Sequence, residues 1–253
     1  MALQEDLKTQ GDFLFRHRSY IPLILLALGL CVKAYQERFD VLASEGWVSE
    51  WLEGGALVVG LAGLAVRAAT VGYTPKDTSG RNTGAGQVAA VLNTTGAYSL
   101  TRNPLYLGNF LMWVAVTMLT GNIWFVAVFS LAFWIYYERI VYAEEAFLRA
   151  KFGAEYLLWA ETTPAFLPSF SAYAPPTMRF NWRKVLRQEK NGLFALMFLV
   201  CLFSLVGDAA EGEFSVAEER ATIIAAVLAG LTYATLKVLK DRTTFLDTPL
   251  DDQ

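Results

Sequence analysis

The segment that decides the fold runs over residues 96–168. It begins with GAYSLTRNPLYLG (96–108), continues through two apolar segments joined by TGN (120–122), and ends with EEAFLRAKFGAEY (144–156) and PAFLP (164–168). The joining turn is too short to hold a domain, so the two apolar segments predict a helical hairpin. Such a hairpin returns the chain to the side on which it started, and the polar clusters at its two ends then lie together.

Composition places this hairpin in a membrane. The chain has 253 residues, of which 55% are hydrophobic, and a mean hydropathy of +0.35. Soluble domains contain roughly 45–50% apolar residues, and here the excess is concentrated in long runs. We therefore predict an all-α, polytopic membrane protein. The net charge of −3 gives no indication of nucleic-acid binding.

The cysteines and the histidine limit which kinds of active site the chain can contain. Cys31 and Cys201 both lie inside apolar runs, which indicates neither a disulfide framework nor a zinc site. The single histidine, His17, lies in a basic cluster before the first apolar run. Serine-type catalytic triads and histidine-based metal sites are therefore excluded, and we predict no metal.

The apolar runs predict about six transmembrane helices, with a surface helix over Glu144–Trp159 and a polar connection over residues 70–95. Three parts follow along the chain: residues 1–95 with the first two spans, a core over 96–170, and residues 171–253 with a basic connector and two added spans. The predicted spans are Tyr20–Val32, Trp51–Val66, Leu105–Leu119, Ile123–Tyr142, Leu193–Val206 and Ala221–Leu236.

The charges at the span ends predict an orientation. Cytoplasmic ends of membrane helices carry an excess of Lys and Arg. The acidic linker before Trp51 and the acidic loop Asp208–Glu219 lie on the opposite side, so both termini are expected in the cytoplasm. The basic residues on the cytoplasmic side are Arg16, Arg18, Arg67, Lys76, Arg81, Arg102, Arg139, Arg149, the Arg179–Lys190 cluster, Lys237 and Lys240.

Two polar clusters on that side are candidates for a site, and each has a simpler interpretation. Glu144 and Glu145 are either solvated charges paired with nearby basic residues, or a carboxylate that binds an ammonium group. Arg102–Pro104 is typical of a helix start with an N-cap and a first-turn proline. That interpretation does not account for Tyr98 and Tyr106 on either side.

The segment resembles the membrane methyltransferases of the isoprenylcysteine carboxyl methyltransferase and phospholipid methyltransferase superfamily. Members carry G-P-Y-R-x-x-R-H-P-x-Y-x-G, a hairpin, then E-E-x-x-L-x-x-x-F-G-x-x-Y-x-x-Y and a V-P-R-F-x-P-like close. The resemblance covers roughly the middle third of the chain. The matching residues are Gly96, Tyr98, Arg102, Pro104, Tyr106, Gly108, Glu144, Glu145, Leu148, Phe152, Gly153, Tyr156, Pro164, Phe166 and Pro168.

The resemblance implies S-adenosylmethionine as cofactor, held at the cytoplasmic face of the hairpin. Glu144 or Glu145 would bind its α-ammonium group, Arg102 and Asn103 its carboxylate, and the tyrosines its adenosine and sulfonium. Methyl transfer would be an in-line displacement that depends on alignment and exclusion of water, with no catalytic residue assigned. The implied cofactor-binding residues are Tyr98, Arg102, Asn103, Tyr106, Gly108, Glu144, Glu145 and Tyr156.

Three departures from the family pattern bear on the methyl acceptor. Asn103 replaces the family histidine, Ala97 a proline, and Ala165 the arginine of the closing motif. If that arginine orients a carboxylate in relatives, Ala165 disfavours a prenylcysteine-like substrate. The Arg179–Lys190 cluster is either a topology determinant or a site for an anionic headgroup. We therefore expect a membrane lipid or amphiphile as acceptor, with Arg139, Arg183 and Arg187 as candidate substrate contacts.

Two other functions stay open at this point. One is an NADPH-dependent membrane reductase of the sterol-reductase type, whose motif has Asp-Glu, a cysteine and Lys-Tyr-Gly where this chain has Glu144-Glu145 and Lys151-Phe152-Gly153. The other is a non-catalytic membrane scaffold that retains the fold. The residues leave open whether the acceptor is a carboxylate, amine, phosphate, thiol or quinone. They also leave open the oligomeric state and the role of the last two spans.

Overall fold

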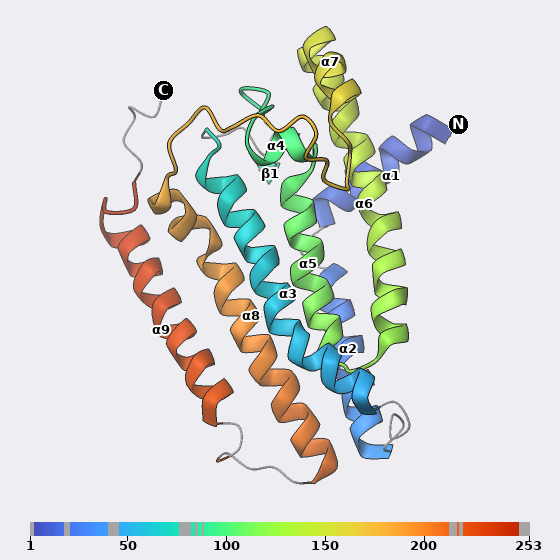
Figure 1. Cartoon of the computed structure of the whole chain (residues 1–253), viewed down its shortest axis with the longest axis vertical. Coiled ribbons are helices and arrows are strands. Elements are labelled where there is room, and N and C mark those ends of the chain that lie inside the picture. Colours follow the sequence, from blue (N-terminus) through green and yellow to red (C-terminus); the bar gives the residue numbers. More distant parts are fainter. Residues whose placement is uncertain are drawn as a thin grey trace.

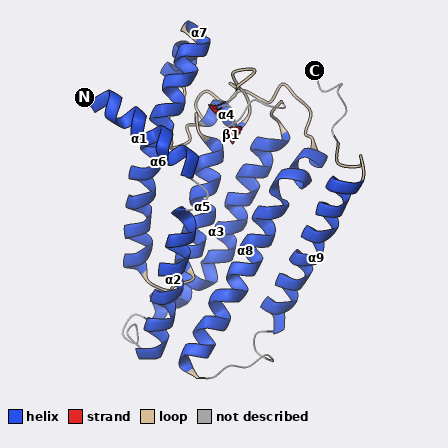
Figure 2. Cartoon of the chain, turned by 180° about the vertical axis from the view of Figure 1, so that it is seen from behind, coloured by secondary structure: helices blue, strands red, loops and turns tan. Residues whose placement is uncertain are grey.

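The structure is a computed structural model that describes residues 3–17, 21–39, 46–75, 82–83, 86–87, 89–212, 217 and 220–247. These residues form helices with one pair of two-residue strands (Figure 2). The elements are α1 (Leu3–His17), α2 (Ile21–Phe39), α3 (Gly46–Gly72), β1 (Asn82–Thr83), β2 (Gly86–Gln87), α4 (Ala97–Leu100), α5 (Pro104–Met118), α6 (Ile123–Phe152), α7 (Ala154–Thr162), α8 (Trp182–Glu211) and α9 (Arg220–Arg242).

The long helices form a bundle with α3 near its centre (Figure 1). Helix α3 packs against α5 and α8, α9 packs on the outer side of α8, and α1 packs on α6. Ala56, Val116 and Phe203 belong to the buried apolar cluster that joins α3, α5 and α8. The segment between α7 and α8 crosses the end of the bundle that carries α4 and α7, which we call the α7 end (Figure 1).

The predicted class, an all-α membrane protein, is confirmed. Among the described residues, four helices are long and apolar enough to cross a membrane, and α5 is a shorter apolar helix. The count of six is not confirmed. The first expected span lies in α2, where Lys33, Glu37 and Arg38 interrupt the apolar sequence. The four candidate spans are Glu50–Gly72, Ile123–Phe152, Trp182–Glu211 and Arg220–Arg242.

One detail of the sequence-based prediction was wrong, and one helix was not predicted. The surface helix expected over Glu144–Trp159 is instead the end of α6 followed by the separate helix α7. A change from apolar to charged side chains does not end a helix, whereas Gly153, with a φ of 54°, does. Residues 3–17, for which the sequence analysis predicted no helix, form α1, whose Phe15 is buried.

Some predicted features lie outside the described residues. These are Arg18, Tyr20, Lys76, Arg81, and Glu213, Glu218 and Glu219 of the acidic loop. The polar connection over residues 70–95 is described in part. Helix α3 continues into it as far as Gly72, and Asn82–Thr83 pairs antiparallel with Gly86–Gln87.

Helices α3 and α5 approach closely because each has a glycine at the crossing. A Cβ on Gly63 would lie 2.7 Å from the Gly108 carbonyl oxygen and 2.8 Å from the Met112 nitrogen. These are backbone atoms, which cannot rotate away. Small residues allow this type of contact between membrane helices. The close contact fixes the start of α5, where the candidate site begins.

We expect Gly63→Ala to lower the unfolding temperature, because the added methyl overlaps the α5 backbone. Overpacking of this kind costs about 1–3 kcal/mol. Gly54→Ala is the matched control, since a Cβ at Gly54 meets nothing within 4 Å. Alanine is favoured over glycine inside a helix by roughly 0.5–1 kcal/mol, so the control should be neutral or stabilised. Thermal unfolding in detergent measures both, and a Gly63→Ala protein as stable as Gly54→Ala would contradict the close contact.

Candidate functional site

The first motif forms a turn that is clamped to the segment after α7. Gly96 has a φ of 61°, a left-handed conformation that favours glycine. Its amide donates to the Ala174 carbonyl (2.9 Å), and the Ala174 amide donates to Ser99 Oγ (3.1 Å). Ser99 Oγ in turn donates to the Gly96 carbonyl (2.7 Å). These bonds hold α4 in place before the chain enters α5.

The closing motif docks directly on the residues between α4 and α5. The Arg102 amide donates to the Pro164 carbonyl (2.8 Å), and Thr101 Oγ1 lies 3.1 Å from the Ala165 carbonyl oxygen. Asn103 Nδ2 donates to the same Ala165 carbonyl (3.0 Å). Asn103 occupies the N-cap position of α5 but makes no side-chain capping bond. Its side chain therefore ties two motifs together, a contact that the sequence alone does not predict.

The first and second motifs meet at a half-buried ion pair. Arg102 NH2 lies 3.2 Å from Glu145 Oε1, and the two side chains are 17% and 18% exposed. Arg149, one helical turn after Glu145, lies 3.8 Å from the other carboxylate oxygen. Glu144 is half-buried beside Glu145 on α6. The structure therefore brings together charges of opposite sign that are 43 positions apart in the sequence.

Tyr156 lies fully buried beside this pair, at the start of α7. Burial, and then the negative charge of Glu145, raise the pKa of its hydroxyl well above the usual range. The hydroxyl consequently stays protonated and acts as a donor, although it makes no well-formed hydrogen bond to another described residue. Its ring lies 5.8 Å from that of Trp159.

Two further buried donors lie in this region of the described chain without an acceptor. They are Nε of Arg102 and the indole Nε1 of Trp159. Buried polar groups are hydrogen-bonded in most structures, so orphaned donors call for an explanation. A ligand with acceptor atoms, such as a carboxylate, would satisfy them. Trp159 was named in the sequence analysis only as the last residue of the predicted surface helix.

We expect Tyr156 to make the stability of the protein depend on pH above about pH 10. The unfolded chain loses tyrosine protons near pH 10, while folded Tyr156 keeps its proton. The free energy of unfolding should therefore fall as the pH rises above about 10, and Tyr156→Phe should remove part of that fall. Thermal unfolding at about pH 8 and about pH 11 tests this. Equal pH dependence in both proteins would contradict the buried, protonated hydroxyl.

Aromatic pairs connect α5, α6 and the closing motif. Tyr106 on α5 packs on Tyr137 of α6, with ring centroids 4.7 Å apart. Trp134 of α6 packs on Phe166 of the closing motif, also at 4.7 Å. Tyr98 lies half-buried on α4. Aromatic faces attract cations, and Tyr98 and Tyr106 each lie four positions from Arg102 in the sequence.

Four residues predicted for the site have other surroundings. A Cβ on Gly108 would lie 2.5 Å from Arg67 Cγ, so the structure gives this glycine a packing role against α3. Arg139 contacts α1 through Gln10. Arg183 and Arg187 lie on α8, which is separated from α6 by α3 and α5 in the bundle (Figure 1).

Arg183 and Arg187 hold the segment that follows α9. The Arg183 guanidinium lies 5.4 Å from the ring centre of Phe245, and Arg187 NH1 lies 3.1 Å from Asp247 Oδ1. These contacts give both arginines a structural partner within the chain. A role in substrate binding stays a prediction.

A buried polar cluster that the sequence analysis missed joins α3, α5 and α8. Arg67 donates through Nε and NH2 to both carboxylate oxygens of Glu189 (2.7 and 2.8 Å) and through NH1 to Asn109 Oδ1 (2.5 Å). Nearby on α8, Lys184 Nζ donates to the Thr74 carbonyl after α3. The sequence feature that could have predicted this cluster is the position of Arg67 and Glu189, two opposite charges at the ends of apolar segments. This cluster attaches the two C-terminal helices to the core.

The fold and these contacts define a helical membrane protein in which the three motifs that resemble those of membrane methyltransferases lie together at one end of the bundle. The model of the family described as "Phospholipid methyltransferase" matches residues 56–155. The chain is 31% identical over 164 residues to the nickel-cobalt-cadmium resistance protein NccN of Alcaligenes xylosoxydans xylosoxydans, covering 64% of this chain and 70% of that protein. It belongs to the phospholipid methyltransferase family.

Two further relatives agree with this assignment. The cobalt-zinc-cadmium resistance protein CzcN of Cupriavidus metallidurans is 30% identical over 64% of this chain and 68% of its own length. The protein-S-isoprenylcysteine O-methyltransferase of Schizosaccharomyces pombe is 33% identical over 31% of this chain and 33% of its own length. No solved structure matches the chain at a significant level.

Proposed function

We propose that this protein is an S-adenosylmethionine-dependent methyltransferase that acts on a lipid or other amphiphile in the membrane. The observation that carries the proposal is the half-buried Arg102–Glu145 pair with the orphaned donors around it. The amino-acid end of S-adenosylmethionine carries one ammonium and one carboxylate. An arginine beside a glutamate is complementary to both groups, and charge-assisted hydrogen bonds to each would be strong.

The residues present fit the cofactor in the following way. Glu145, with Glu144 beside it, would bind the ammonium group, and Arg102 with the Trp159 and Tyr156 donors would bind the carboxylate. Tyr106 and Tyr98 would line the region of the sulfonium. Gly108 and Asn103 act indirectly, since Gly108 sets the contact of α5 with α3 and Asn103 fixes the closing motif.

S-adenosylmethionine supplies an electrophilic methyl group, so the protein's part is to align the reactants and exclude water. Buried Tyr156 excludes water beside the ion pair. Asn103 cannot act as the histidine of relatives would, because an amide does not take up a proton near pH 7. We assign it the positioning of the Ala165 backbone, to which it is bonded. The arrangement needs neither a general base at that position nor a metal.

The orientation is part of the proposal. The α7 end carries Arg102 and Arg149, and Arg16 lies in the last turn of α1. The positive-inside rule would place this end, with both termini, in the cytoplasm. The acceptor would then approach from the cytoplasmic leaflet. A cysteine introduced at exposed Glu155 on α7 should react with a membrane-impermeant thiol reagent only when the reagent has access to the cytoplasmic side of the membrane.

Transfer of a labelled methyl group to a total lipid extract tests the function. Label in the organic phase, lost when S-adenosylhomocysteine is added in excess, is the expected result. Two relatives are named for resistance to divalent metals, so extracts from cells grown with and without cobalt or cadmium should be compared. Purified protein that binds NADPH and not S-adenosylmethionine would favour the reductase. Protein that binds neither would favour the scaffold.

A further inference from the structure

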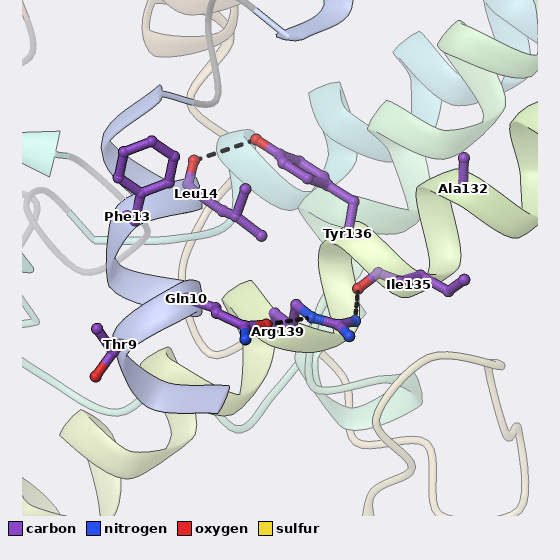
Figure 3. Close-up of a pocket in the computed structure, with 8 residues that line it drawn as sticks. All are labelled: Thr9, Gln10, Phe13, Leu14, Ala132, Ile135, Tyr136 and Arg139. Carbon is purple, nitrogen blue, oxygen red and sulfur yellow. Dashed lines mark hydrogen bonds between the residues drawn. The ribbon is translucent and has the colours of Figure 1, made fainter. Parts of the chain in front are cut away.

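Helices α1 and α6 enclose a groove of about 740 Å³ on the side of the bundle (Figure 3). Its walls are mostly apolar, with Phe13 and Leu14 from α1 and Ala132, Ile135 and Tyr136 from α6. Ligand sites in proteins typically measure roughly 300–1,000 Å³ and are lined mainly by apolar side chains. The groove therefore has the size and lining of a site for an apolar chain.

The walls of the groove are fixed by direct contacts between the two helices. The Tyr136 hydroxyl donates to the Leu14 carbonyl (3.2 Å). Gly11 lies so close to α6 that an added Cβ would meet the Arg139 carbonyl oxygen and lie 2.8 Å from the Ala143 Cβ. The groove is thus set by a close helix crossing at Gly11, next to the lining residues.

The groove faces hydrocarbon rather than water if α6 crosses the membrane. Helix α6 is one of the four helices that are long and apolar enough to do so. Ile135, in the wall of the groove, is 53% exposed. An apolar face at this depth would be covered by lipid chains.

A single charge lies among the eight lining residues, and it is positive. Arg139 Nε donates to Gln10 Oε1 (2.8 Å) and NH1 to the Ile135 carbonyl (2.7 Å), as Figure 3 shows. These two bonds, made by Nε and NH1, orient the guanidinium. A guanidinium fixed in this way is complementary to a phosphate.

We propose that this groove binds one acyl chain of an anionic phospholipid, with the lipid phosphate on Arg139. The charge of Arg139 selects the anionic headgroup, and the apolar walls hold the chain. The site is distinct from the Arg102–Glu145 pair and does not depend on methyl transfer. A failure of the methyltransferase assignment would leave it untouched.

Native mass spectrometry of the purified protein tests the proposal. The protein is mixed with equal amounts of phosphatidylglycerol and phosphatidylcholine of the same chain length. We expect one phosphatidylglycerol to be retained preferentially. Ala132→Trp, which fills the groove, should lower retention at least fivefold, whereas Leu131→Trp, on an exposed neighbouring position outside the groove, should not.

A second pair of variants tests the charge. Arg139→Gln should bring the ratio of the two retained lipids close to one, whereas Arg242→Gln, an exposed arginine on α9, should leave the preference unchanged. Phosphatidylglycerol with a diazirine on one acyl chain should crosslink to peptides of α1 and α6. If Ala132→Trp does not fold, the crosslinking experiment and the Arg139→Gln variant still test whether the groove binds the lipid.

Three results would overturn the proposal. They are equal retention in Ala132→Trp and Leu131→Trp, an unchanged lipid preference in Arg139→Gln, and crosslinks confined to other helices. A dimer that only Ala132→Trp disrupts would show instead that a second copy of the chain occupies the groove.

Discussion

Glu145→Gln is expected to weaken the binding of S-adenosylmethionine by roughly 10- to 100-fold and to lower methyl transfer by at least as much. Glu145 is the carboxylate that the structure places against Arg102. Glutamine keeps the shape of the side chain but loses the charge that would bind the cofactor's ammonium group. Hydrogen bonds to charged groups contribute about 1.5–3 kcal/mol, which corresponds to that range of affinities. Calorimetric titration with S-adenosylmethionine measures the loss.

The control for this prediction is Glu155→Gln, because Glu155 is an exposed glutamate on α7 close in sequence to Tyr156. It should bind the cofactor like the unmodified protein. Glu144→Gln distinguishes the two adjacent acids, and we expect a smaller effect than at Glu145. Thermal unfolding checks that each variant is folded. A folded Glu145→Gln protein with unchanged affinity would show that the cofactor binds elsewhere.

The fold class and the meeting of the motifs follow from local features of the sequence. The turn at residues 120–122 is too short for anything but a hairpin, so Arg102 and Glu145 had to return to the same end. The bounds of α6 and the existence of α1 were harder to predict. Helix α6 continues for eight residues beyond Glu144 because its backbone bonds do not depend on side-chain polarity, and it ends only at Gly153. Helix α1 was hard to predict because it depends on packing against α6, a tertiary contact.

The spatial grouping of the candidate site residues was predictable in part for the same reason. The motifs indicated Arg102, Glu145 and Tyr156, and the structure places them together. Gly108 belongs to the same motif but contacts α3, because a glycine pattern does not distinguish a ligand contact from a helix crossing. Trp159 and the contact of Asn103 with Ala165 depend on how α7 and the closing motif fold back. These are tertiary contacts, and no local pattern in the sequence predicts them.

The buried Arg67–Glu189 pair is expected to have the largest effect on stability. Glu189 is 6% exposed and Arg67 is 23% exposed, and two hydrogen bonds join them. Glu189→Gln would leave the Arg67 charge without its partner, which costs about 3–5 kcal/mol at buried sites. At roughly 2–4 °C per kcal/mol for a chain of this size, the unfolding temperature should fall by about 6–20 °C.

The matched control is the Arg187–Asp247 pair, which begins on the same helix. Its side chains are 39% and 53% exposed, and exposed pairs contribute about 0–1 kcal/mol. Arg187→Gln should therefore change the unfolding temperature by only a few degrees. The double variant Arg67→Met/Glu189→Leu removes both charges, and replacing a buried pair by apolar residues is often neutral or stabilising. It should recover most of the loss caused by Glu189→Gln alone.

These three variants separate the charge from the packing at the α3–α8 contact. If the penalty of Glu189→Gln comes from an uncompensated charge, the double variant is more stable than the single one. If Glu189 matters only as a filler between helices, both are equally destabilised, and the assignment of this cluster as the attachment of α8 to the core would be wrong. Arg67 also packs on Gly108 near the start of α5. If Glu189→Gln displaces Arg67, it should therefore also disturb the candidate site. Cofactor affinity should then fall in Glu189→Gln and return in the double variant.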